Sequence, residues 1–405
     1  MKILLLTGHF PPEKTGGTGR PYSLYKYLPD DGIGVCVVTR DFYGTLPGEK
    51  DIFRYDSFWS WRKSSWLSRK MSLKIISLVK NIIYGINYDS WWASKVLQGV
   101  NDYASEEIGL IYASFPGPEV LEAALKLKAI LQIPLIVEFR DGLAFETVLN
   151  KPNFFQKIVI SKLEKRIVSS ADTIITIGEN LSNYFRQQYN RGAYTVYNGY
   201  EESDFNLLAN DETKKTGKKC LVHFGSLGAS RAAKRNGLFT ALKYLKSRKV
   251  IDGNNFCLLF IGNISSREKK EIASYDLDDI ISFMPQMDKR EGFSFISRQA
   301  DYLLFYGVPN ATTIVSSKLP EYTRLHKPVI GICKGNEAEL IIKKTGTGEV
   351  CDFDEKSIEL LLIKMLNDEI HYQPDHLEIS KFNRKHQAKE IAGLIKRCLA
   401  KFEIA

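Results

Sequence analysis

The chain has 405 residues, of which 44% are hydrophobic and 25% charged, and a formal net charge of +9. This length favours two or three domains, and the composition excludes a largely disordered chain. The positive charge indicates an anionic partner, such as a nucleotide, a nucleic acid or a membrane surface. The six cysteines are scattered, mostly within apolar runs and without metal-ligand spacing. We therefore expect reduced thiols in a cytoplasmic protein.

An apolar run at residues 2–7 opens the chain; it is too short and wrongly flanked for a signal peptide and predicts a buried strand. Glycines crowd the loop that follows, at Gly16, Gly17 and Gly19, before an expected helix at about 22–28. A glycine-rich loop after the first strand of a βαβ unit is typical of a doubly wound parallel sheet, in which such loops form the ligand crevice. A plain turn is the alternative, because the third glycine of the dinucleotide motif is missing.

The segment 54–95 differs from the rest of the chain. It holds all five tryptophans, Trp59, Trp61, Trp66, Trp91 and Trp92. Its eight Lys or Arg and two Asp give a local balance of +6. Apolar residues recur at helical spacing, at Leu73, Ile76, Val79, Ile83 and Ile86.

Two interpretations of this segment stay open. An amphipathic helix with basic and aromatic residues suits the headgroup layer of an anionic membrane. A helix packed against the first sheet, with solvated basic residues, explains the same pattern. No window reaches the apolar length that a membrane span needs, so we expect membrane contact to be peripheral, at the inner face of the cell membrane.

Strands and helices alternate through the rest of the chain. Strands are expected at 35–39, 109–113, 134–139, 171–177, 194–197, 220–224, 256–261, 280–284, 302–306 and 329–333. Helices are expected at 118–130, 161–169, 238–246 and 384–401. The polar stretch 206–219 is typical of a linker. We therefore predict an α/β protein with two Rossmann-like doubly wound domains, at 1–205 and 206–375, and a C-terminal segment at 376–405.

The stretch 316–333, SSKLPEYTRLHKPVIGIC, predicts a short helix that enters a buried strand. Ser316, Ser317 and Lys318 stand at the start of this helix, where unpaired N–H groups and a lysine suit phosphate oxygens. Glu321 could accept hydrogen bonds from sugar hydroxyls. The combination fits a nucleoside diphosphate, although an ordinary amphipathic helix with solvated charges would have the same sequence.

Five segments, taken in order, resemble the GT-B glycosyltransferases of the large retaining family GT4. They are GHFPPEKTGGTGR, the stretch from WWASKV to EFRDGLA, ADTIITIGENLSNYF with VYNGYEESDF, FGSLGASRAAKRNGL, and SSKLPEYTRLHKPVIG. The resemblance covers nearly the whole chain. It implies two domains that face each other across a cleft, with the donor on the second, and a last helix that crosses back to the first. One departure is Thr313, which stands where the family often has the first of two glutamates; Glu321 matches the second.

The resemblance also implies a function and a set of site residues. We expect retaining, metal-independent transfer of a sugar from a nucleotide-diphosphate donor to a glycan or polyprenyl-diphosphate-linked acceptor in bacterial surface polysaccharide assembly. The expected catalytic residues are Asp141, Arg140 and Lys318. Donor contacts are expected from Gly225, Ser226, Leu227, Arg231, Lys234, Arg235, Gly262, Asn263, Pro285, Met287, Ser316, Ser317, Lys318, Leu319 and Glu321. Acceptor contacts are expected from Gly16, Gly17, Arg20, His9 and Ser114.

Other functions remain open at this point. Thr313 allows a catalytically inert partner protein that keeps the fold. A nicotinamide-dependent oxidoreductase is disfavoured by the incomplete glycine motif, and no basic–aromatic module for nucleic acid is present. Asp141 could be a structural carboxylate paired with Arg140. The Asp352–Phe353–Asp354 sequence resembles a metal-binding DxD motif, but we interpret it as chance and expect no metal or cofactor.

Overall fold

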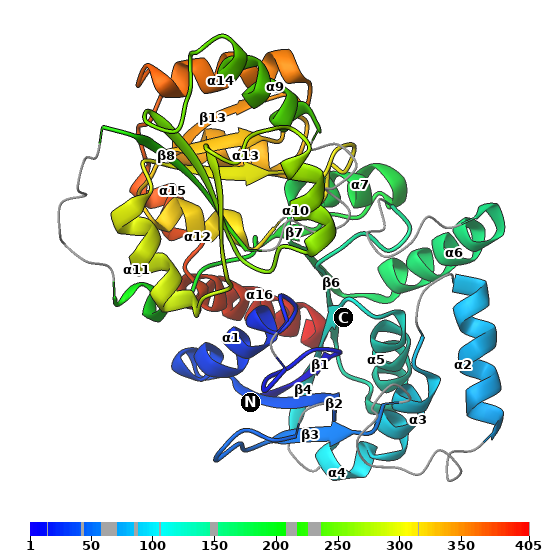
Figure 1. The fold of residues 1–405 in the computed structure, drawn as a ribbon. Coiled ribbons are helices and arrows are strands. Elements are labelled where there is room, and N and C mark those ends of the chain that lie inside the picture. The colour runs from blue at the N-terminus through cyan, green and yellow to red at the C-terminus, as the bar shows by residue number, and fades with distance from the viewer. Residues whose placement is uncertain are drawn as a thin grey trace. The chain divides into compact units, whose positions relative to one another are not determined.

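The computed structural model describes residues 1–13, 15–41, 44–57, 71–84, 88–104, 107–145, 153–207, 217–225, 236–314 and 316–404. The chain forms two compact units, one of Met1–Tyr197 with Arg384–Ala405 and one of Asn198–Asn383 (Figure 1). The sequence places the boundaries at 205 and 376, whereas residues 198–205 and 376–383 lie in the second unit. The last helix lies in the first unit.

A seven-stranded parallel sheet forms the centre of the first unit, in the order β3-β2-β1-β4-β5-β6-β7. Its strands are β1 (Lys2–Thr7), β2 (Gly34–Arg40), β3 (Ile52–Tyr55), β4 (Ile108–Phe115), β5 (Leu135–Phe139), β6 (Thr173–Thr176) and β7 (Tyr194–Thr195). Its helices are α1 (Gly19–Tyr27), α2 (Met71–Tyr84), α3 (Ser90–Gln98), α4 (Val100–Ala104), α5 (Pro118–Leu131), α6 (Phe154–Ser170), α7 (Glu179–Tyr189) and α16 (Arg384–Ile404), with the 3₁₀ turn η1 (Leu28–Asp31).

Successive side chains of a strand point to opposite faces of the sheet, so an apolar strand needs helices on both faces, and both faces are covered here. Leu4 and Leu6 of β1 pack in a core with residues of α3, α5, α6 and α7. Ile3 and Leu5 pack in a second core with residues of α1 and α16. The last helix of the chain therefore completes the core beneath the first strand.

A six-stranded parallel sheet forms the centre of the second unit, in the order β10-β9-β8-β11-β12-β13. Its strands are β8 (Lys219–Phe224), β9 (Phe256–Ile261), β10 (Ile281–Met284), β11 (Tyr302–Tyr306), β12 (Val329–Ile332) and β13 (Gly348–Cys351). Its helices are α9 (Asn236–Ser247), α10 (Ser266–Ala273), α11 (Lys289–Gln299), α12 (Lys318–Arg324), α13 (Glu337–Thr345), α14 (Glu355–Leu366) and α15 (His376–Ser380), with the 3₁₀ turn η3 (Glu202–Phe205).

The predicted α/β class with two doubly wound parallel sheets is confirmed. Two strands escaped prediction, β3 and β13, which lie at the edges of their sheets and carry mostly half-buried side chains. The strand β13 ends just before the DxD-like sequence. In this sequence, a carboxylate oxygen of Asp352 lies 2.7 Å from the Nζ of Lys334. Asp354 accepts a hydrogen bond from the Ser357 N–H at the start of α14. Both carboxylates therefore have structural partners.

The helix α6 begins at Phe154, seven positions before the expected start at 161. Asn153 caps it: its side chain accepts from the Gln156 N–H, and the Gln156 side chain accepts from the Asn153 N–H. This capping box fixes the early start, which the apolar pattern used for the prediction does not include. Among the helices of the described ranges, none combines the length and apolar character that crossing a bilayer requires.

Candidate functional site

Two glycines meet at the carboxyl ends of β8 and β9 in the second unit. The φ angles of Gly225 and Gly262 are +105° and +153°, values that residues with a Cβ rarely adopt. A Cβ on Gly262 would lie 2.6 Å from the carbonyl carbon of Gly225. Glycine is therefore required at both positions, where the ends of β8 and β9 approach each other closely.

Lys318 lies directly against Gly225. A Cβ on Gly225 would lie 2.6 Å from the Cε and 2.7 Å from the Nζ of Lys318. The buried His223 orients this ammonium group: its Nδ1 lies 3.0 Å from the Leu304 carbonyl oxygen, which can only accept, so Nδ1 donates. The lone pair of Nε2 then faces Nζ of Lys318 at 3.4 Å. A cation is thus held against the peptide backbone at the end of β8, an arrangement that suits phosphate oxygens.

Glu321 is buried one turn further along α12. It forms an ion pair with Lys289, the first residue of α11. The hydroxyl of Tyr322 accepts a hydrogen bond of 2.8 Å from the Phe224 N–H and so fixes α12 to the end of β8. No local pattern identifies Lys289, because its partner lies 32 positions away with no regular spacing between them.

The other expected donor contacts vary in their placement. Ser226, Leu227, Arg231, Lys234 and Arg235 lie outside the described residues. The Oγ of Ser316 accepts from the Lys318 N–H at 3.3 Å, Ser317 occupies the cap position of α12, and the Leu319 side chain is buried in the protein. Asn263 and Pro285 are exposed and Met287 is half-buried. Because α12 has only seven residues, Lys318 is a stronger source of positive charge than the helix dipole.

In the first unit, Arg140 and Asp141 follow β5. The buried Arg140 guanidinium donates to the Phe115 and Gly17 carbonyls and so supports the glycine-rich loop from below. Burial lowers the pKa of Arg140, although Glu138 and Asp141 oppose that effect. Asp141 is half-buried, and burial raises the pKa of its carboxyl group to about 6 against the opposing charge of Arg140.

Arg20, which is expected to contact an acceptor, binds other residues of the protein instead. Its Nε lies 3.1 Å from a carboxylate oxygen of the buried Glu138. The guanidinium also donates to the side chain of Gln387 on α16 and to the carbonyls of Val196 and Tyr197. The hydroxyl of Ser114 donates to the other oxygen of Glu138 at 2.8 Å. Arg20 and Ser114 therefore hold Glu138 and tie α1, β5 and α16 together.

The other residues expected to contact an acceptor are His9, Gly16 and Gly17, in the loop that follows β1. The Nδ1 of His9 lies 2.9 Å from a carboxylate oxygen of Glu13. A Cβ placed on Gly17 would lie 3.1 Å from the His9 ring. Among the described atoms, none lies within 4 Å of a Cβ placed on Gly16. A side chain at Gly17 would push the His9 ring by a few tenths of an ångström, whereas Gly16 leaves room for a ligand.

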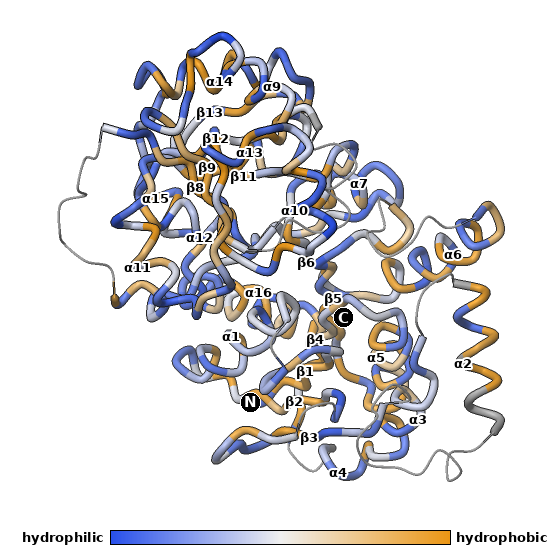
Figure 2. Tube along the Cα trace, in the orientation of Figure 1, coloured by the Kyte–Doolittle hydropathy of each residue, from blue (hydrophilic) through white to orange (hydrophobic). Residues whose placement is uncertain are grey.

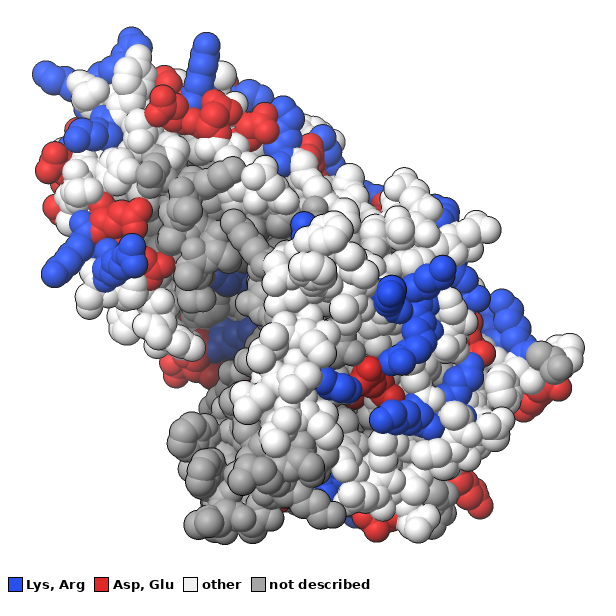
Figure 3. Space-filling model, turned by 90° about the vertical axis from the view of Figure 1, so that its right-hand side faces the viewer, with Lys and Arg blue, Asp and Glu red and all other residues white. Residues whose placement is uncertain are grey.

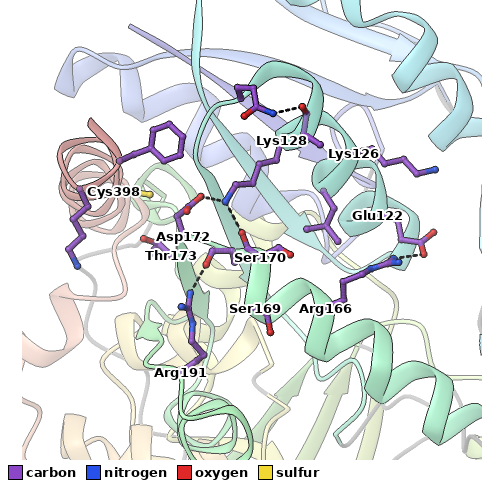
Figure 4. Close-up of a pocket in the computed structure, with 16 residues that line it drawn as sticks. Glu122, Lys126, Lys128, Arg166, Ser169, Ser170, Asp172, Thr173, Arg191 and Cys398 are labelled. Carbon is purple, nitrogen blue, oxygen red and sulfur yellow. Dashed lines mark hydrogen bonds and ion pairs between the residues drawn. The ribbon is translucent and has the colours of Figure 1, made fainter. Parts of the chain in front are cut away.

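A separate recess in the first unit lies at the opposite, amino edge of the sheet (Figure 4). Its polar groups bind one another. Lys128 contacts Asp172 at 2.6 Å and the Ser170 carbonyl at 2.8 Å, and Arg166 contacts Glu122 at 2.9 Å. Because ligands of open α/β sheets bind at the carboxyl edge, this recess is not the expected site.

No protein-family model matches the sequence, and no curated protein matches it. Solved structures do match. Sucrose-phosphate synthase from Thermosynechococcus elongatus has a TM-score of 0.70 and 15% identity, over 99% of this chain and 99% of its own. The lipopolysaccharide outer core galactosyltransferase WaaB in its apo form has a TM-score of 0.66 and 13% identity, over 98% and 100%. HepE from Anabaena in complex with UDP has a TM-score of 0.54 and 13% identity, over 100% and 98%.

These likenesses confirm the GT-B fold that the sequence predicts. A UDP-N-acetylglucosamine 2-epimerase structure matches as well. At such identities the likeness establishes the fold and does not choose between the reactions.

Proposed function

We propose that this chain is a glycosyltransferase that moves a sugar from a nucleotide-diphosphate donor to a glycan or polyprenyl-diphosphate-linked acceptor in surface polysaccharide assembly. One observation carries the proposal: the Lys318 ammonium group lies against Gly225, at the sheet edge where nucleotides bind in such folds. A galactosyltransferase and a UDP complex among the structures of the same fold support it.

In this proposal the second unit offsets the charge of the leaving diphosphate. Lys318 is held in place before the reaction, so its ammonium group stabilises negative charge without reorganising. Glu321 accepts hydrogen bonds from the ribose hydroxyls, and Lys289 keeps its carboxylate in position. We further propose that no metal takes part and that the anomeric configuration is retained.

The first unit would bind the acceptor. Asp141 has a raised pKa of about 6, so it is ionised at neutral pH and still basic enough to orient or deprotonate a hydroxyl. Arg140 fixes the loop that carries Gly16 and Gly17 through its contact with the Gly17 carbonyl. Arg20 and Ser114 act as positioning residues, because both bind the protein.

A thermal-shift screen with UDP, GDP and dTDP and their sugars tests the donor site. The matching nucleotide at a hundred times its Kd should add about 2.7 kcal/mol of stability. No shift with any of them would contradict the proposal. Product analysis then separates the reactions: transfer or slow hydrolysis supports it, an epimerised nucleotide sugar assigns the chain to epimerisation, and binding without turnover assigns it to an inert partner. Turnover should persist in EDTA.

A further inference from the structure

The helix α2 exposes its apolar face instead of burying it. Its described side chains include six exposed aliphatic residues, Ile75, Ile76, Leu78, Val79, Ile82 and Ile83, of which Ile82 is 73% exposed. At about 100° of rotation per residue they span an arc of about 160°. An ordinary surface helix turns such a face towards the core.

The polar side of α2 is the side that binds the protein. The Nζ of Lys80 lies 2.6 Å from a carboxylate oxygen of Glu122 and 2.7 Å from the Tyr88 hydroxyl. The side-chain oxygen of Asn81 accepts from the Tyr88 N–H. These bonds fix the rotation of the helix about its axis. The outward apolar face is therefore a consequence of specific contacts.

The start of α6 extends the apolar surface. Phe154, Phe155 and Ile158 are exposed there, Phe155 by 76%. The side-chain nitrogen of Gln156 donates to the Ile82 carbonyl at 2.9 Å and joins the two helices, which lie side by side in Figure 1. We call the six aliphatic residues of α2 and these three residues of α6 the α2–α6 patch; Figure 2 shows how strongly apolar α2 is.

Positive charge beside this patch exceeds negative charge, although Arg166 pairs with Glu122 of α5. The exposed charged residues of α6 are all basic, Lys157, Lys162, Lys165 and Arg166. Its single acidic residue, Glu164, is buried and accepts from the hydroxyls of Tyr184 and Tyr189. The helix α2 has no acidic residue. Figure 3, which turns this side towards the viewer, shows Lys and Arg gathered beside a largely uncharged surface.

The charge decides between two occupants of the patch. In a symmetric dimer the same surface meets itself, so the basic residues of α6 would face their own copies with no carboxylate on either helix to pair with. An anionic membrane offers acyl chains to the apolar residues and headgroup phosphates to the cations. The membrane therefore satisfies both features.

We propose that the α2–α6 patch docks the chain on an anionic lipid surface, with α2 lying in the plane of the headgroups. Both helices belong to the first unit, the one proposed to bind the acceptor, so docking would bring it to lipid-linked substrates. The docking rests on the patch alone and does not depend on donor turnover. The two proposals can therefore fail separately.

Flotation of the full chain with vesicles tests this inference. We expect binding to mixed phosphatidylglycerol–phosphatidylcholine vesicles, and little binding to phosphatidylcholine alone or at high salt. Phe154→Ser combined with Phe155→Ser should weaken binding at least tenfold, because two large apolar side chains no longer insert. Lys162→Glu combined with Lys165→Glu should weaken it by about fivefold or more per residue. All four side chains are exposed, so the fold should be retained, as thermal unfolding can confirm.

Leu377→Ser is the matched control, because Leu377 is 78% exposed on the second unit. It should leave vesicle binding unchanged. Failure of the intact chain to bind anionic vesicles would overturn the inference, as would equal binding by the double phenylalanine variant. Sedimentation tests the other occupant: a dimer that the phenylalanine variant dissociates, without vesicle binding, would assign the patch to a second copy.

Discussion

Replacement of Lys318 by alanine tests the proposed donor site directly. The side chain lies against Gly225 and is oriented by His223, so its removal leaves the backbone intact and takes away one positioned cation. A hydrogen bond to a charged group contributes about 1.5–3 kcal/mol. We therefore expect donor affinity and turnover to fall by roughly ten- to a hundredfold.

The assay is nucleotide-induced thermal stabilisation, with turnover measured alongside. A concentration that gives the parent chain about 2.7 kcal/mol should give the variant about 1.4 kcal/mol after tenfold weakening, and about 0.4 kcal/mol after a hundredfold weakening. Lys343→Ala is the control, because Lys343 forms only a surface pair with Glu339, which contributes little. If Lys318→Ala keeps the full stabilisation and turnover, the diphosphate binds elsewhere.

Three further substitutions test the remaining roles. Glu321→Ala should raise the donor KM about tenfold with a smaller effect on kcat, and an unchanged KM would contradict its role at the ribose. Because burial raises the pKa of Asp141 to about 6, its carboxylate form dominates only above that pH, so parent activity should fall as pH drops through 6. Asp141→Asn should lower kcat about a hundredfold or more and remove this acidic limb, whereas an intact kcat would favour a structural carboxylate. Arg20→Met should destabilise the chain by about 1.5–3 kcal/mol in thermal unfolding, because the buried Glu138 loses its ion pair with Arg20 and keeps the Ser114 hydrogen bond and the Arg140 charge; a parent-like melting temperature would refute that role.

The sequence predicts the strands at the centre of each sheet best. The expected bounds of β1, β9 and β11 agree with the structure because each is a short apolar run whose side chains are mostly buried. Edge strands differ: β7 and β10 lie within expected ranges, whereas β3 and β13 carry mostly half-buried side chains and are missed. The structure defines β3 and β13 through hydrogen bonds to one neighbour, and the local sequence does not encode that pairing.

Some residues of the candidate site can be predicted from the local sequence, and the roles of others depend on distant partners. The sequence predicts Gly225, Gly262 and Lys318 as donor contacts, because glycines after strands and a lysine at a helix start have local signatures. The structure places these three residues in contact. Arg20 has a local signature too, but its partners lie 118, 176, 177 and 367 positions away. Only the folded chain reveals that a basic residue beside a glycine loop serves to hold its final helix.

The orientation of α2 depends on a residue outside the helix. Its apolar periodicity is equally compatible with packing on the sheet and with exposure, so the pattern alone cannot choose. Glu122, on α5, binds Lys80 and draws the polar side inwards. Had that position been apolar, nothing would compensate Lys80 when buried, and the helix would gain more by turning its aliphatic face to the core. Glu122 and Tyr88, both outside α2, thus decide together whether the helix covers the core or offers a surface to lipid.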